Sequence, residues 1–249
     1  MSALQWLEIA AAVVFGCTLQ GAVGFGGGLF AIPLMVWSGL SLPSAIAVIL
    51  GGVFVQTSWN LYRYRGHVSL NELMPITLIR IVSMPVGVML LSMLVGLGTD
   101  RVKQVIGIVL ILVLAMQRLF RISPRERVSA DWTVLAGVTS GLMAGTVGMG
   151  GPPVVLWVMA HDWPGRKSRS FLWATFLMLT PFNLGVLVYR FGGEIWVSLG
   201  VGLCLAPLII IGSELGQRLG GMMNRHRLRS TTMLMLLLLA VMSVVGPLF

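Results

Sequence analysis

Residues 21–33 read GAVGFGGGLFAIP, and this stretch decides the fold. It lies inside an apolar run from Leu4 to Leu42, where Glu8 carries the only charge. Glycine costs up to about 1 kcal/mol per residue in a helix interior, so the cluster predicts a break between two helical pieces. Within a membrane, broken backbone is tolerated only where protein buries it or where it lines a watery cavity. The cluster therefore indicates both a membrane fold and the place of a site.

A second glycine cluster occurs in the other half of the chain. Residues 145–153 read GTVGMGGPP, and they also lie in a long apolar segment. The four residues from Gly24 align with the four from Gly148, although Pro152 stands where the first copy has Gly28. Two interrupted segments at corresponding positions of two halves indicate the binding site of a transporter.

The composition is that of an integral membrane protein. Of 249 residues, 57% are hydrophobic and 10% are charged, whereas soluble domains are about 25% charged. The net charge of +9 comes from basic residues in short loops between apolar spans, which is typical of membrane orientation rather than nucleic-acid binding. The two cysteines, Cys17 and Cys204, both lie in apolar segments, so no disulfide framework or metal site is expected. No cleaved signal peptide is expected either, because the N-terminus lacks a basic region and a cleavage site.

Apolar stretches of about 20 residues predict the spanning helices. Residues 1–120 form a first repeat, with a glycine-broken segment at 4–40 and helices at 43–62, 72–95 and 101–120. Residues 121–131 form a basic cytoplasmic linker. Residues 132–249 form a second repeat, with a broken segment at 132–160 and helices at 169–189, 194–217 and 229–248.

The positions of the basic residues predict how the broken segments lie. If both turn back as re-entrant hairpins, one side of the membrane carries 13 of the 17 Lys and Arg residues and the other carries three. If both cross once, the split is seven against nine. The positive-inside rule favours the hairpins. The predicted fold is thus all-α, with two inverted repeats of one hairpin and three transmembrane helices each, and with both termini in the periplasm.

The two glycine motifs, the duplicated halves and the chain length together resemble the TauE/SafE sulfite exporter family, also called TSUP membrane permeases. The resemblance covers the whole chain. It implies a multi-pass protein of the bacterial inner membrane that carries small anions, often sulfur-containing ones such as sulfite or organosulfonates.

The glycine loops predict an anion site without the help of that resemblance. Gly151 followed by two prolines is typical of a helix start, and Gly27 with Gly28 matches it in the first half. Helix N-termini offer free N–H groups and about half a positive charge, so two that face each other would hold an anion. The alternative is that the glycines only allow close helix packing.

Polar residues near the loops extend this predicted site. Arg80 is the one cation placed well inside a predicted span, which indicates function unless the side chain snorkels to the basic side. Thr146 lies beside a loop, and amides within spans require hydrogen-bond partners. Roles for Cys17 and Glu8 stay open. The predicted substrate-binding residues are Gly24, Gly26, Gly27, Gly28, Gly148, Gly150, Gly151, Gln20, Thr146, Gln56, Asn183 and Arg80.

The predicted function is secondary transport of a small anion by alternating access, without a cofactor. A coupling ion, either H⁺ or Na⁺, is possible, and the sequence identifies neither the anion, the direction of transport nor the oligomeric state. The alternatives are a passive anion or small-solute channel and a membrane-embedded enzyme. An enzyme is disfavoured because the three histidines lie in predicted loops and no HExxH or GxSxG motif is present.

Overall fold

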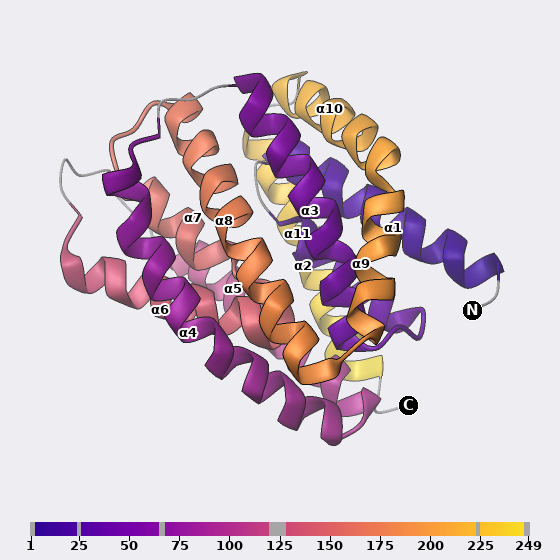
Figure 1. The fold of residues 1–249 in the computed structure, drawn as a ribbon. Helices are drawn as coiled ribbons and strands as arrows, with labels where there is room; N and C mark the ends of the chain where they lie inside the picture. Colours follow the sequence, from indigo (N-terminus) through magenta and orange to yellow (C-terminus); the bar gives the residue numbers. More distant parts are fainter. Residues whose placement is uncertain (1–2, 24–25, 65–67, 120–127, 223–224, 247–249) are drawn as a thin grey trace.

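The computed structural model describes residues 3–23, 26–64, 68–119, 128–222 and 225–246. Over these residues the chain forms eleven α-helices (Figure 1). Five of them are long and apolar enough to cross a membrane, or six if one bent pair is a single span. The predicted all-α membrane class is therefore confirmed. The helices are α1 (Ala3–Val23), α2 (Gly27–Trp37), α3 (Leu42–Tyr64), α4 (Leu70–Gly96), α5 (Thr99–Leu119), α6 (Ala130–Val147), α7 (Gly151–Met159), α8 (Gly165–Phe191), α9 (Glu194–Cys204), α10 (Ala206–Met222) and α11 (Arg225–Val245).

The helix bounds lie within a few residues of those predicted, and one predicted helix is divided. The single helix predicted for residues 194–217 consists of α9 and α10, which meet at an angle of 54°. Pro207 lies in the first turn of α10. Proline has no N–H to donate, and its ring clashes with the carbonyl four residues earlier, so a helix running through this point breaks or bends.

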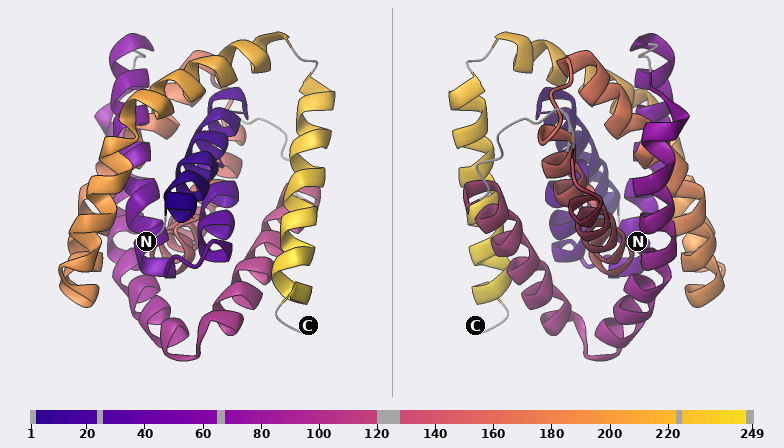
Figure 2. Two further views of the ribbon diagram at one scale, coloured as in Figure 1. Left: turned by 90° about the vertical axis from the view of Figure 1, so that its right-hand side faces the viewer. Right: turned by 90° about the vertical axis from the view of Figure 1, so that its left-hand side faces the viewer.

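Each glycine-broken segment folds back as a helical hairpin. A Cβ atom placed on Gly39 would lie 3.8 Å from Nε2 of Gln5, so the start of α1 lies beside the end of α2. In the second half, the Trp157 indole N–H donates to the hydroxyl of Thr133 at 2.9 Å. That bond joins the end of α7 to the start of α6. Figure 2 shows the α1–α2 hairpin within a frame formed by α4, α5, α10 and α11.

The helix contacts of the two halves match each other. Helix α1 packs on α10 as α6 packs on α4, and α3 packs on α9 as α8 packs on α4. Glycines allow the closest of these approaches. A Cβ atom on Gly21 would collide with the backbone of Ser213, and one on Gly145 would collide with that of Met84. These matched contacts agree with a two-fold relation between the halves, and the inverted orientation in a membrane stays a prediction.

Two polar contacts between helices, here called clasps, lie at opposite ends of the molecule. At the first turns of α4 and α8, Lys167 forms an ion pair with Glu72 at 2.7 Å. At the first turns of α3 and α9, the Ser44 hydroxyl donates to the Glu194 carboxylate at 2.6 Å, and Ser41 donates to the same oxygen at 3.2 Å. The first turns of α4 and α8 lie toward the top of Figure 1, and those of α3 and α9 lie toward the bottom.

Candidate functional site

The backbone at the two breaks takes conformations that favour glycine. Gly26, which precedes α2, has φ +98°, and Gly148, which follows α6, has φ +71°. An L-residue with a side chain rarely adopts this left-handed region. Gly150 then caps α7 with an ordinary φ of −72°. The positive φ values explain why glycine occurs at these positions of each break.

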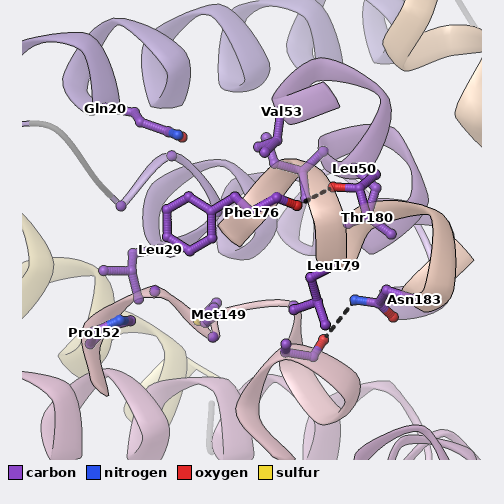
Figure 3. A pocket seen from close by; sticks show the side chains of 18 of the residues that line it. Gln20, Leu29, Leu50, Val53, Met149, Pro152, Phe176, Leu179, Thr180 and Asn183 are labelled. Carbon is purple, nitrogen blue, oxygen red and sulfur yellow. Dashed lines mark hydrogen bonds between the residues drawn. The ribbon is translucent and has the colours of Figure 1, made fainter. Parts of the chain in front are cut away.

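The two breaks meet at a partly open cavity. Its volume is about 80 Å³, several times the roughly 10–15 Å³ that one water molecule requires. Glycines of both breaks line it, together with side chains from α1, α3, α4 and α8. Figure 3 shows the Phe176 ring in this space, with Gln20 on one side and Leu179 and Asn183 on the other. The site is therefore built from both halves of the chain.

Nine of the twelve predicted binding residues line this one cavity. Gly24 lies outside the described residues, and Thr146 and Gln56 are not among the lining residues. Thr146 donates to the carbonyl oxygens of Leu142 and Gly87, at 2.8 and 3.1 Å. A substrate contact by Thr146 or Gln56 stays a prediction. The nine lining residues are Gln20, Gly26, Gly27, Gly28, Arg80, Gly148, Gly150, Gly151 and Asn183.

The two half-helices do not offer equal numbers of N–H groups. The first N–H groups of a helix have no partner within it. In α2 these include the N–H groups of Gly27 and Gly28. In α7 the second and third residues are Pro152 and Pro153, which have no N–H, so Gly151 is the donor of that first turn. Because proline stands at position 152, where the first copy has glycine, the first turn of α2 offers more N–H donors than the first turn of α7.

Arg80 brings a full positive charge to the cavity wall. Its side chain is 1% exposed, so it does not snorkel to the surface. One guanidinium nitrogen donates to the hydroxyl of Thr175 at 2.7 Å, and the Phe176 ring centre lies 5.4 Å from Cζ. Nε has no hydrogen-bond partner among the residues that the structure describes. The ion pairs within the described part of the chain are Arg63–Glu214 and Lys167–Glu72, so no carboxylate there neutralises Arg80.

A comparison with protein families matches residues 9–243 to the family described as "Sulfite exporter TauE/SafE". The match spans nearly the whole chain. This chain belongs to the sulfite exporter TauE/SafE family. The resemblance that the glycine motifs indicated is thus confirmed, and with it the assignment to membrane transport. Comparisons with curated proteins and with solved structures give no match.

In this TauE/SafE protein, Asn183 and Gln20 complete the polar part of the cavity wall. The Asn183 amide N–H donates to the Ala144 carbonyl oxygen at 3.3 Å, while its own oxygen has no hydrogen-bond partner in the described part of the chain. A Cβ atom on Gly27 would collide with the side-chain oxygen of Gln20, so that amide lies directly against the first turn of α2. Both residues are buried.

The apolar wall of the TauE/SafE cavity includes side chains that sequence reasoning did not single out. Phe176 is the most central of them in Figure 3. No local signal marks it, because α8 is apolar along most of its length. Its position beside Arg80 depends on how α4 and α8 pack. The other such residues are Leu29, Ile49, Leu50, Val53, Ala144, Met149 and Leu179, and Pro152 and Thr180 line the cavity as well.

Proposed function

We propose that this TauE/SafE protein is a secondary transporter that moves a small anion across the bacterial inner membrane by alternating access. Sulfite, an organosulfonate or another sulfur oxyanion is the expected substrate class. The anion binds at the N-termini of α2 and α7, near the middle of the membrane, with Arg80 beside it. Both termini of the chain face the periplasm.

The observation that carries this proposal is a buried arginine that no carboxylate of the described residues neutralises, in a cavity lined by two helix N-termini. Removing one ion from water costs several kcal/mol even after the protein relaxes. A nearby anion offsets that cost, and each helix N-terminus adds about half a positive charge. All three features favour a negatively charged occupant.

Anion binding by the purified protein tests the proposal. Thermal unfolding would be followed with sulfite, sulfate, thiosulfate, sulfoacetate, taurine and acetate. The test variant is Gly151→Leu, because a Cβ atom there meets only Phe176, at an ordinary 3.7 Å, and the larger side chain fills the cavity. The matched control is Gly185→Leu on α8, where no described atom beyond the neighbouring backbone of α8 lies within 4 Å of the added Cβ.

We expect at least one sulfur oxyanion to stabilise the wild type and the Gly185→Leu control, and to leave Gly151→Leu unchanged. Equal responses from the two variants, or no response from the wild type, would overturn the proposed site. Counterflow in proteoliposomes then separates a carrier from a passive channel, because only a carrier accelerates exchange. Repeating the assay under imposed H⁺ and Na⁺ gradients identifies a coupling ion.

A further inference from the structure

Uncharged groups hold the Arg80 side chain in place. This arrangement supports an inference that rests on the proposed function. We propose that Thr175 is a positioning residue that orients the Arg80 guanidinium through an uncharged hydroxyl, so that the transported anion serves as its counterion. Thr175 lies behind the cavity wall and acts on the anion through Arg80.

The geometry around Thr175 forms a short hydrogen-bonded chain. Its hydroxyl accepts from Arg80 at 2.7 Å and lies 3.0 Å from the hydroxyl of Thr77. Both threonines are fully buried. A hydroxyl has one donor and two acceptor positions, so the Thr175 hydroxyl can bond to Thr77, as donor or as acceptor, while a lone pair receives the arginine N–H.

Thr175 is oriented differently from Thr180, its neighbour on the same helix. The Thr180 hydroxyl donates to the carbonyl oxygen of Phe176 at 2.9 Å, as threonines in membrane helices often do. The Thr175 hydroxyl instead bridges from α8 to two residues of α4. It is also absent from the cavity wall, whereas Arg80 and Phe176 line it. The hydroxyl therefore lies where it can orient the guanidinium without touching the anion.

The proposed role depends on the Thr175 hydroxyl being an uncharged acceptor. A carboxylate at this position would form a buried ion pair with Arg80, held by charge-assisted hydrogen bonds. The guanidinium would then be neutralised permanently and would no longer attract a mobile anion. A hydroxyl fixes the orientation of the guanidinium and leaves its charge available, together with an Nε that no described residue bonds.

Three substitutions of Thr175 separate this role from ordinary packing. Thr175→Val keeps the shape and removes the hydroxyl, and Thr175→Ser keeps the hydroxyl. Thr175→Asp supplies a fixed counterion. Each variant is titrated with the sulfur oxyanion that stabilises the wild type, and its melting temperature without anion is recorded.

We expect Thr175→Val to bind about tenfold more weakly, the loss typical of one hydrogen bond to a charged group. Thr175→Ser should bind like the wild type. Thr175→Asp should lose its response to the anion while its anion-free melting temperature holds or rises. Damage to packing would lower the anion response and the anion-free melting temperature together. A lost anion response with an unchanged or higher melting temperature therefore identifies the electrostatic role. If the valine variant fails to fold, the serine and aspartate variants still decide the question.

Arg80→Gln distinguishes the failure of this inference from the failure of the proposed site. If Arg80→Gln abolishes binding but Thr175→Val and Thr175→Asp bind like the wild type, Thr175 does not position the guanidinium and the proposed function stands. If Arg80→Gln itself binds like the wild type, Arg80 has no role in the site and the inference falls with it. A wild type that responds to no anion overturns both.

Discussion

A Cβ atom placed on Gly28 would lie 3.1 Å from the carbonyl oxygen of Gly148. The first turn of α2 therefore touches the first residue of the break that follows α6, and the two halves of the chain meet at their glycine loops. Because the contact is backbone to backbone, the loops form one packed unit on which the shape of the cavity depends.

The left-handed backbone at Gly26 gives the first prediction. We expect Gly26→Ala to lower stability by about 1–2 kcal/mol, because φ is +98° and a Cβ atom strains that conformation. We also expect it to weaken anion binding, since Gly26 lines the cavity. Thermal unfolding with and without the stabilising anion measures both effects.

Gly192→Ala is the matched control for Gly26→Ala. Gly192 has φ +75° and no atom within 4 Å of an added Cβ, and it lies in the turn between α8 and α9. It should lose at least as much stability, because φ +75° with ψ −152° is a conformation adopted almost only by glycine, and its anion response should be unchanged. If both variants bind equally well, the conformation of Gly26 matters for folding alone.

Gln56 gives the second prediction, which concerns stability. Its amide N–H groups donate to the Cys17 carbonyl oxygen at 3.1 Å and to the Ser213 hydroxyl at 2.9 Å. These two bonds tie α3 to α1 and α10. We expect Gln56→Leu to lower the free energy of unfolding by about 1 kcal/mol and to leave anion affinity unchanged. An intact melting temperature with reduced affinity would instead place Gln56 in contact with the substrate, as the sequence suggested.

Much of the site could be predicted from the sequence, because glycine clusters in apolar segments have few physical explanations. Arg80 was predictable for the same reason, since a cation within an apolar span is costly. The orientations of Thr146 and Gln56 were not predictable. In a membrane, lipid-facing and buried helix faces are both apolar, so periodicity does not reveal which face of α3 or α6 points inward. The position of Phe176 likewise depends on how α4 and α8 pack.

The hairpin at residues 4–40 gives the third prediction, which concerns topology. With Cys17 and Cys204 replaced by alanine, single cysteines are introduced by Gln5→Cys, Ser41→Cys and Ser69→Cys. We expect a membrane-impermeant thiol reagent added to intact cells to label the first two, because the hairpin places them on one side. Ser69→Cys should react only after permeabilisation. Labelling of Gln5→Cys and Ser41→Cys from opposite sides would show a single crossing.

His161 gives the fourth prediction, which concerns pH. Burial lowers the pKa of His161 below its ordinary value of 6.5, and the ring stacks on Trp163 with centroids 4.2 Å apart. Glu72 and Lys167 are the charged groups that act on it. In the window from the lowered pKa up to 6.5, the unfolded chain binds more protons than the folded one. Stability should therefore fall as pH falls through that window.

The His161→Gln variant tests that dependence. Melting temperatures of wild type and variant would be compared in small pH steps from neutral to mildly acidic. We expect a shallower decrease for the variant, since glutamine does not titrate. Identical slopes would assign the pH dependence to other groups.

The two clasps at opposite ends give the fifth prediction. Glu72–Lys167 and Glu194–Ser44 are both formed in this structure, and each ties a helix of one half to a helix of the other. Alternating access requires the two ends to open in turn, so loosening one clasp should favour opening at that end.

The opening at each end is measured by labelling a single cysteine in the cavity wall. Leu50→Cys introduces this cysteine in the cysteine-free background. Glu194→Gln should raise the labelling rate from the α3 and α9 end a few-fold, and Glu72→Gln should do so from the α4 and α8 end. The changes are modest because partly exposed pairs contribute at most about 1 kcal/mol. Ser44→Ala should act like Glu194→Gln, and combining the two should add little, since Glu194→Gln weakens the hydrogen bond that Ser44→Ala removes. Equal changes from both ends in each variant would show that the clasps stabilise the fold without gating the cavity.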